Sequence, residues 1–355
     1  MQEFDKDNQT ALEAKEYVQS LAFGPIAFQA ARALVRLGIL SRVEQARPKG
    51  ITPEEMAEQL GLSIYGARVL MEAGLGIGLL TVNDRRFRVT KAGWCLLHDR
   101  MTQVNMGFVN DICYRGMLDL DKSVRAGKPE GLKVFGSWPT IYEALAHLPP
   151  DTRSSWLDFD HYYSDAAFPD ALPLVFRYEP QHILDVGGNT GRWALQCVRF
   201  SKDAHVSIAD LPGQLKMAEE AIRTHEGNER ITCAPLDVLN PESAIPSGFD
   251  AIWMSQFLDC FSEDQIRHIL AKCRRAMESG GRLFILEPFW DRQRFKASAF
   301  SLQMTSLYFT AMANGNSQMY RSSLVLALLN EEGFEIEEQF DHLGVGHTLL
   351  VCRPS

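Results

Sequence analysis

The chain has 355 residues, a formal net charge of −9 at pH 7, 46% hydrophobic residues and 23% charged residues. This composition is ordinary for a soluble globular protein, and the length allows two modest domains with separate cores. The negative charge argues against broad binding to a nucleic-acid backbone, which needs clustered Lys and Arg. A small molecule or another protein is the expected partner.

The cysteines and the apolar segments predict a cytoplasmic protein. The seven cysteines are scattered and contain no C-x-x-C pair, so neither a disulfide framework nor a metal site is expected. No apolar run approaches the roughly 20 residues that cross a bilayer. Residues 1–14 are polar and acidic, unlike a signal peptide. We therefore expect no contact with a membrane.

Residues 1–100 are expected to form a winged-helix-like domain. Apolar residues recur at helical spacing over 17–40, and capping signals open further helices over 52–61 and 63–78. Residues 80–89 alternate around a polar turn, which predicts a hairpin. Helices followed by a hairpin are the element order of a winged helix.

The predicted helix over 63–78 is poorly suited to reading DNA. Arg68 is its only cation, whereas base readout needs several Arg, Lys, Asn or Gln side chains. Arg85, Arg86 and Arg88 in the hairpin are more simply interpreted as a solvated turn. We therefore expect a role in dimerisation. The helix carries an apolar stripe made of Val69, Leu70, Ala73 and Ile77.

Residues 101–175 are mostly helical in pattern and are expected to bridge the domains and contribute to a substrate pocket. Aromatic and apolar side chains in this segment and beyond it are candidate walls for a flat substrate, although core packing is an equally good interpretation. They are Trp156, Phe159, Tyr162, Tyr163, Phe257, Phe300, Met304 and Tyr308.

Residues 176–355 carry the pattern that points to chemistry. A short apolar strand over 182–186 runs into a glycine-rich turn and then a helix, which lets a ligand approach bare backbone. A second strand ends in Asp210, an acid suited to accept both ribose hydroxyls. Further strands are expected at 231–235, 249–254 and 281–287. This alternation predicts a doubly wound, mostly parallel α/β sheet with ligands at the carboxyl ends of its strands.

The glycine turn alone does not choose between a nicotinamide cofactor and S-adenosylmethionine. The order Asp-x-Gly-x-x-x-Gly over 185–191 resembles the first motif of class I methyltransferases. Asp210-Leu211-Pro212 resembles the second-strand motif of small-molecule O-methyltransferases of the caffeate and acetylserotonin type, and residues 280–287 resemble their fifth-strand motif. The resemblance implies a Rossmann-like methyltransferase domain behind a winged-helix-like domain, and a homodimer formed through the latter.

The resemblance also implies S-adenosyl-L-methionine as the cofactor and methyl transfer to a small organic acceptor, with a hydroxyl oxygen as the first choice. Simpler roles stay open: the glycines could only form a tight turn, Asp210 could cap a helix, and Asp185 could orient the glycine loop. Asp237 could be a plain loop acid. The residues expected at the cofactor are Asp185, Gly187, Gly188, Gly191, Asp210, Leu211, Asp237, Val238 and Ser255.

The sequence departs from this family where the catalytic base is expected. Asp259 stands where family members carry His, Glu287 matches the first flanking acid, and no acid is present near Gln318 or Met319. An unperturbed Asp lies about six pKa units below a phenol, roughly 8 kcal/mol, against roughly 5 kcal/mol for His. Burial adds three to five units at most. Asp259 is therefore expected to be a poor replacement.

Three hypotheses preserve methyl transfer. The acceptor is more acidic than a phenol, or another base such as His161 acts, or alignment of the reactants does most of the work. Two alternatives to the methyltransferase stay open. One is a family member that binds S-adenosylmethionine with altered or no methyl transfer, and the other is a winged-helix regulator that senses the cofactor.

Overall fold

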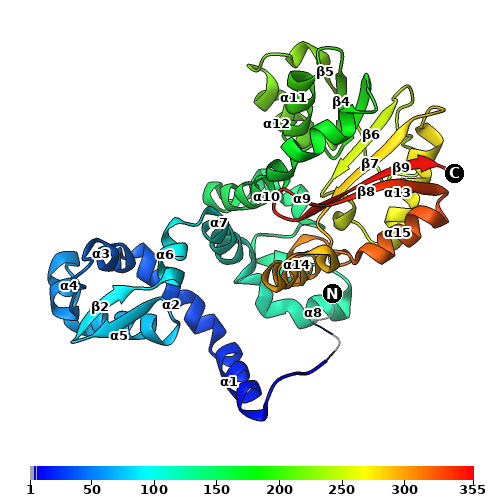
Figure 1. The fold of residues 1–355 in the computed structure, drawn as a ribbon. Helices are drawn as coiled ribbons and strands as arrows, with labels where there is room; N and C mark the ends of the chain where they lie inside the picture. Colours follow the sequence, from blue (N-terminus) through cyan, green and yellow to red (C-terminus); the bar gives the residue numbers. More distant parts are fainter. Residues whose placement is uncertain (1–3, 5) are drawn as a thin grey trace. The chain divides into compact units, whose positions relative to one another are not determined.

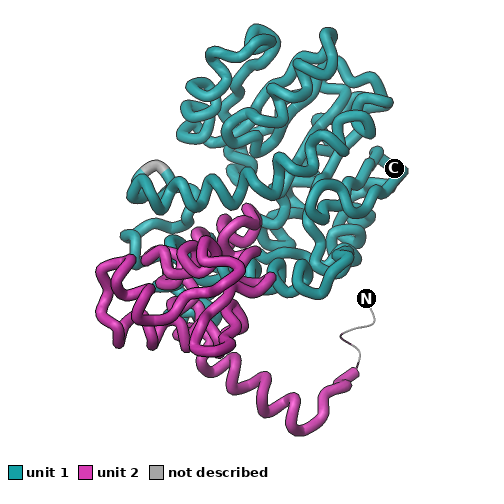
Figure 2. Tube along the Cα trace, turned by 60° about the vertical axis from the view of Figure 1, so that its left-hand side comes forward, with its two compact units in different colours: residues 1, 110–355 teal, residues 2–109 magenta. Residues whose placement is uncertain are grey.

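The computed structural model describes residue 4 and residues 6–355 of the chain. It divides into two compact units, an N-terminal unit up to Val109 and a larger unit from Asn110 to Ser355 (Figure 2). Each unit has its own hydrophobic core. No helix in the described part of the chain is long and apolar enough to cross a membrane.

The N-terminal unit is helical apart from one hairpin, as predicted (Figure 1). Thr52 and Glu55 form a reciprocal capping box, and the Ser63 side chain accepts from the Gly66 N–H, so the predicted helix starts are confirmed. The elements are α1 (Ala11–Ala22), α2 (Gly24–Arg36), α3 (Ile39–Gln45), α4 (Pro53–Leu60), α5 (Ile64–Gly76), β1 (Leu80–Asn83), β2 (Arg86–Val89), α6 (Lys91–His98) and α7 (Arg100–Phe108).

The apolar stripe predicted on α5 is only partly confirmed, because Leu70 and Ile77 pack against the core of the unit while Val69 does not. The buried line is Ala67, Met71 and Gly74, whereas Val69 is 43% exposed. The reason is close packing, because a Cβ on Gly74 would lie 2.8 Å from the Leu80 side chain. Small residues let α5 approach its neighbours, and hydrophobicity alone did not reveal that side of the helix.

The larger unit is built on a seven-stranded sheet with the order β5-β4-β3-β6-β7-β9-β8. Strands β3 to β7 are parallel, while β9 runs antiparallel to both β7 and β8. The predicted doubly wound, mostly parallel sheet is confirmed, although the β8–β9 pair was not predicted. The strands are β3 (His182–Val186), β4 (His205–Asp210), β5 (Ile231–Pro235), β6 (Ala251–Ser255), β7 (Arg282–Glu287), β8 (Phe334–Leu343) and β9 (His347–Pro354).

Helices cover both faces of this sheet because successive strand residues point to opposite sides. Trp253 stacks on Trp193 of α11 with ring centroids 3.8 Å apart, while its neighbours Ile252 and Met254 pack in the cluster of the other face. The helices that contribute to the two clusters are α10 (Pro150–Phe176), α11 (Arg192–Phe200), α12 (Pro212–Ile222), α13 (Glu263–Ala276) and α15 (Ser322–Glu331).

The remaining helices of the larger unit precede the sheet or follow β7. Those that precede the sheet agree with the helical pattern of residues 101–175. Two five-residue π-helical segments, Val109–Cys113 and Phe309–Ala313, interrupt the α-helical pattern. Such segments are often found at functional sites. The helices are α8 (Leu120–Ala126), α9 (Ile141–Ala144) and α14 (Lys296–Tyr308).

Candidate active site

The glycine loop follows β3 and leaves no room for side chains. Gly187 has φ +76°, and a Cβ there would lie 2.2 Å from the Phe257 ring. A Cβ on Gly188 would lie 2.6 Å from a carboxylate oxygen of Asp185. Gly191 then opens α11. Exposed backbone at the start of a helix is the setting in which a cofactor can be held closely.

Asp185 lies beneath this loop and is only 2% exposed. Burial, and then the charge of Asp210, raises the pKa of Asp185 to about 8. Its Oδ2 atom has no hydrogen-bond partner among the described residues. A neutral acid under Gly188 fits the orienting role considered from the sequence.

Asp210 ends β4 beside the same loop. Its Oδ2 accepts the Asn189 N–H at 3.0 Å, and its Oδ1 accepts the Leu211 N–H at 2.7 Å. Each carboxylate oxygen accepts two hydrogen bonds, so both retain capacity for a ribose hydroxyl. Burial raises the pKa of Asp210 to about 6.

Helix α10 supports the glycine loop from the other side. Asp160 Oδ2 accepts the Asn189 side-chain amide at 2.9 Å, and His161 Nε2 lies 3.4 Å from the Thr190 hydroxyl. Burial lowers the pKa of His161, and the charge of the nearby Asp160 acts in the opposite direction. The structure thus brings His161 to the cofactor loop.

Asp237 and Val238 follow β5. Asp237 is exposed and accepts the Leu239 N–H at 3.0 Å, whereas Val238 is buried. The Val238 carbonyl accepts a hydrogen bond at 3.0 Å from Lys272, a side chain on α13 that is 4% exposed. Lys272 was not predicted, because a lone lysine in a polar helix pattern gives no signal of burial.

The end of β6 has a strained backbone. The Ser255 hydroxyl is buried, with no hydrogen-bond partner in the described part of the chain. Gln256 then adopts φ +47°, a conformation that costs a non-glycine residue about 1–3 kcal/mol and persists where surrounding contacts enforce it. The chain turns sharply here, which places the Phe257 ring against Gly187.

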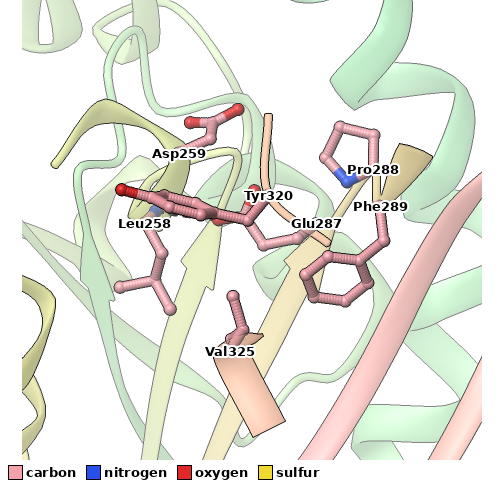
Figure 3. Close-up of a pocket in the computed structure, with 7 residues that line it drawn as sticks. All are labelled: Leu258, Asp259, Glu287, Pro288, Phe289, Tyr320 and Val325. Atoms are coloured by element: carbon pink, nitrogen blue, oxygen red, sulfur yellow. Dashed lines mark hydrogen bonds between the residues drawn. The ribbon is translucent and has the colours of Figure 1, made fainter. Parts of the chain in front are cut away.

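Asp259 lies on the turn after β6 and Glu287 ends the neighbouring strand β7, and both carboxyl groups are buried (Figure 3). They are 4% and 3% exposed. Glu287 ends β7, and its Oε1 accepts the N–H groups of Phe257 and Leu258 at 2.9 and 2.8 Å. The Cys260 thiol lies 3.4 Å from Asp259 Oδ1. Glu287 therefore fixes the turn on which Asp259 stands.

Burial changes the pKa on which the expectation of a poor base at Asp259 rested. Loss of solvent raises the pKa of Asp259 to about 7, and the pKa of Glu287 is raised through burial and through the charge of Asp259. The gap from Asp259 to a phenol falls to about three units, roughly 4 kcal/mol, which is as small as the gap for His.

The space at these two acids is small. It has essentially no room for a bound molecule, whereas small-molecule sites commonly measure roughly 300–1,000 Å³. An aromatic acceptor therefore needs neighbouring side chains to move. The lining residues are Leu258, Asp259, Glu287, Pro288, Phe289, Tyr320 and Val325 (Figure 3).

The predicted aromatic walls separate into four groups. Trp156 donates to the Tyr308 hydroxyl at 2.8 Å, and the Tyr163 ring contacts both Phe159 and Tyr162. Phe257 packs on Phe261, whereas Phe300 and Met304 are 53% and 43% exposed. Tyr142 was not predicted, and its buried hydroxyl has a pKa raised by burial and by Cys260.

No group of side chains suited to hold a metal ion occurs among the described residues, and all seven cysteines are free thiols.

Comparisons with known proteins point to one family. The model of the O-methyltransferase domain matches residues 119–335, and that of the Dimerisation2-like domain matches residues 15–87. L-tyrosine C(3)-methyltransferase of Streptomyces lavendulae is 24% identical over 321 residues, 89% of this chain and 86% of that protein. Acetylserotonin O-methyltransferase of Bos taurus is 22% identical over 290 residues, 78% of this chain and 80% of that protein.

Solved structures share the fold. The S-adenosylmethionine-dependent methyltransferase SibL has a TM-score of 0.74 at 24% identity, covering 96% of this chain and 99% of its own. Human N-acetylserotonin methyltransferase in complex with S-adenosylmethionine has a TM-score of 0.69 at 18% identity, covering 99% of both chains. The family model spans more than half of the sequence, so the chain belongs to the O-methyltransferase domain family and is an S-adenosylmethionine-dependent enzyme that methylates a hydroxyl group of a small molecule.

Proposed function

We propose that the acceptor is a phenol on a small aromatic molecule and that Asp259 is the general base. The carrying observation is the burial of Asp259 at the position of the family's base, which brings its pKa to about 7. When bound, S-adenosylmethionine supplies an electrophilic methyl group on a sulfonium. The phenol oxygen would receive this methyl group, with S-adenosylhomocysteine as the leaving group, and the phenol proton would pass to Asp259.

Glu287 is proposed to position Asp259. It receives two backbone N–H groups from the turn that carries Asp259, and the two buried carboxyls disfavour each other's ionisation. His161 is reassigned in this proposal from base to support of the glycine loop, because its contacts are with Thr190 and Asp160.

The cofactor site is proposed at the carboxyl ends of β3 to β6. Asp210 accepts the ribose hydroxyls, and Leu211 covers the adenosine beside it. Support comes from the spare acceptor capacity of Asp210 and from the bare backbone of the loop. The other members of the set are Asp185, Gly187, Gly188, Gly191, Asp237, Val238 and Ser255.

One relative favours a second acceptor atom. L-tyrosine C(3)-methyltransferase is named for methylation at carbon, and a deprotonated phenol is also nucleophilic at the ring carbon next to its oxygen. The same base would serve both reactions. Proton NMR of the product separates them, because an O-methyl ether retains every ring proton and a C-methyl product has lost one.

We also propose a homodimer formed through a winged-helix-like domain over residues 1–100, followed by a helical bridge over 101–175 and the cofactor domain over 176–355. The structure describes every residue of α1, and none of them is buried. A helix of this length is only marginally stable in water when nothing packs against it. The match to the Dimerisation2-like domain supports the same reading. Large apolar side chains exposed on α1 and the start of α2 are Leu12, Tyr17, Val18, Leu21, Phe23 and Ile26.

A nucleic-acid role is disfavoured in this proposal because the cations of the hairpin are already engaged. Arg85 pairs with Glu54 at 2.9 Å, Arg86 pairs with Glu55 at 3.0 Å, and Arg88 donates to backbone carbonyls. Arg68 lies 3.5 Å from Glu54. A cytoplasmic location is proposed from the seven free thiols, which a reducing compartment preserves.

The test begins with calorimetric titration of S-adenosylmethionine and S-adenosylhomocysteine into ligand-free protein and into an Asp210→Ala variant. Micromolar binding that is lost in the variant supports the cofactor site. A panel of phenols, aliphatic alcohols and aromatic carboxylic acids is then incubated with methyl-labelled cofactor. Transfer to phenols that depends on Asp259 supports the proposal. Transfer only to alcohols or acids overturns the acceptor class, and cofactor binding without any transfer overturns the reaction.

A further inference from the structure

His347 is a buried histidine that the proposed reaction does not use. It opens β9 and is 1% exposed. Burial lowers its pKa to about 4, so the ring is neutral and carries a single N–H. The Nε2 atom lies 2.9 Å from the Gln256 side-chain oxygen, an acceptor, which places the hydrogen on Nε2. The other ring nitrogen has no hydrogen-bond partner among the residues described.

An unpartnered nitrogen makes this histidine an unfavourable choice for packing alone. An apolar side chain of similar size would fill the same place without an unsatisfied polar atom. The one hydrogen bond of the ring goes to Gln256, the residue that holds the strained backbone at the end of β6. The buried histidine and the strained backbone of Gln256 explain each other, because a strained conformation persists only where its surroundings enforce it.

Gln256 lies next to residues that contact the glycine loop and to the turn that carries Asp259. The residue before it is Ser255, and the residue after it is Phe257, whose ring fills the space beside Gly187. The same turn continues into Asp259, with the N–H groups of Phe257 and Leu258 held by Glu287. A change in the backbone at Gln256 would therefore move both the glycine loop and the carboxyl group of Asp259.

The hairpin tip between β8 and β9 fixes His347 in turn. The Gly344 N–H donates to Asp170 of α10 at 2.8 Å, and the Gly346 carbonyl accepts from Gln293 at 2.8 Å. A Cβ on Gly344 would lie 2.6 Å from the α10 backbone at Ala166, so the tip packs directly on that helix. Helix α10 also supports the glycine loop.

We propose that His347 is a positioning residue for methyl transfer. Through Gln256 it sets the placement of Phe257 at the cofactor loop and of Asp259 at the acceptor. The part of this inference that concerns Asp259 rests on the function proposed above, whereas the part that concerns the cofactor loop does not.

The test compares two variants, His347→Leu and His347→Gln. The amide N–H of the introduced glutamine reaches about as far as the Nε2–H of the histidine. The matched control is Thr348→Val, because Thr348 is the next residue of β9, is also 1% exposed, and bonds to Asp341 instead of Gln256. The readouts are the Kd for S-adenosylhomocysteine, kcat with a phenol acceptor, and Tm. Misplacement of a site by about 1 Å can cost on the order of 100-fold in rate.

His347→Leu is expected to weaken S-adenosylhomocysteine binding and lower kcat by roughly 10- to 100-fold, with Tm unchanged or raised. His347→Gln is expected to recover most of both, and Thr348→Val to leave both unchanged. In a Gln256→Gly background, where the backbone needs no support, His347→Leu is expected to add no further loss. Wild-type binding and kcat in His347→Leu, or an equal loss in the Gln256→Gly background, would overturn the proposal.

The binding readout separates this proposal from the function it builds on. A wild-type protein that binds S-adenosylhomocysteine but methylates no phenol defeats the proposed acceptor. The effect of His347→Leu on S-adenosylhomocysteine binding still decides the role of His347 in that case.

Discussion

Replacing Asp259 by Asn should make the protein more stable and nearly inactive. The amide has the same shape but no charge, so it removes the ionisation that burial opposes. The pKa of Asp259 rises from 3.8 to about 7 on folding. This difference of about three units corresponds to at most roughly 4 kcal/mol of unfolding free energy.

The sign of the pH dependence follows from that shift. An acid whose pKa is raised by folding is protonated in both states below pH 3.8, and stability falls as the pH rises from there toward 7. The stability advantage of Asp259→Asn should therefore be small near pH 4, grow through pH 5 and 6, and level off above pH 7. Urea unfolding at each pH measures it.

The activity of the same variant should fall by about 10²- to 10⁴-fold, the range of general base catalysis. The binding of S-adenosylmethionine should survive. In the wild type, kcat should rise with pH and level off above about 7, because the carboxylate is the active form. Asp259→His should shift the rise of kcat to lower pH, because burial lowers the pKa of a histidine below its ordinary value of about 6.5.

The control for Asp259→Asn is Asp203→Asn, a change at an exposed acid in the loop before β4. It should alter neither stability nor rate. If Asp259→Asn retains activity within a few-fold of wild type, Asp259 is not the base. If its stability relative to wild type does not change with pH, the burial argument is wrong even where activity is lost.

Three further predictions use other parts of the site and the N-terminal unit. Gly187→Ala should abolish cofactor binding measured by calorimetry, because its Cβ would lie 2.2 Å from the Phe257 ring at φ +76°. Lys272→Met should raise the Kd for S-adenosylhomocysteine several-fold with little loss of acceptor affinity, since Lys272 holds the loop carbonyl of Val238. Met71→Ala should lower the unfolding free energy of the N-terminal unit by about 2–5 kcal/mol, read by urea unfolding, because Met71 is fully buried.

The parts of the fold that could be predicted are those in which a short stretch of sequence has a characteristic hydrophobic pattern. Strands β3 to β7 could be predicted because each is a short apolar run bounded by turns or by a helical pattern. The β8–β9 pair was not predicted, because β8 is largely half-buried with two register shifts, although β9 contains the buried apolar run from Leu349 to Cys352. Its pairing depends on contacts with β7, which are distant in sequence.

The candidate site divides in the same way. The glycine loop and Asp210 are adjacent to strand ends and carry a recognisable spacing. Lys272, Tyr142 and His347 were missed because their role depends on burial and on partners far along the chain, such as the 91 positions between Gln256 and His347. The sequence also could not show the environment of Asp259, which decides its strength as a base.

Family members carry His at the position of Asp259. In this chain the strength of the base is therefore set by the surroundings of the side chain and not by its residue type. A histidine is a base near neutral pH in water, whereas Asp259 becomes one only while the site stays dry, with the charge of Asp160 adding to the effect of burial. A bound acceptor displaces more water from Asp259 and should raise its pKa further. The pH at which kcat reaches its plateau should then increase with the apolar bulk of the acceptor, a dependence that a histidine, whose pKa desolvation lowers, would show with the opposite sign.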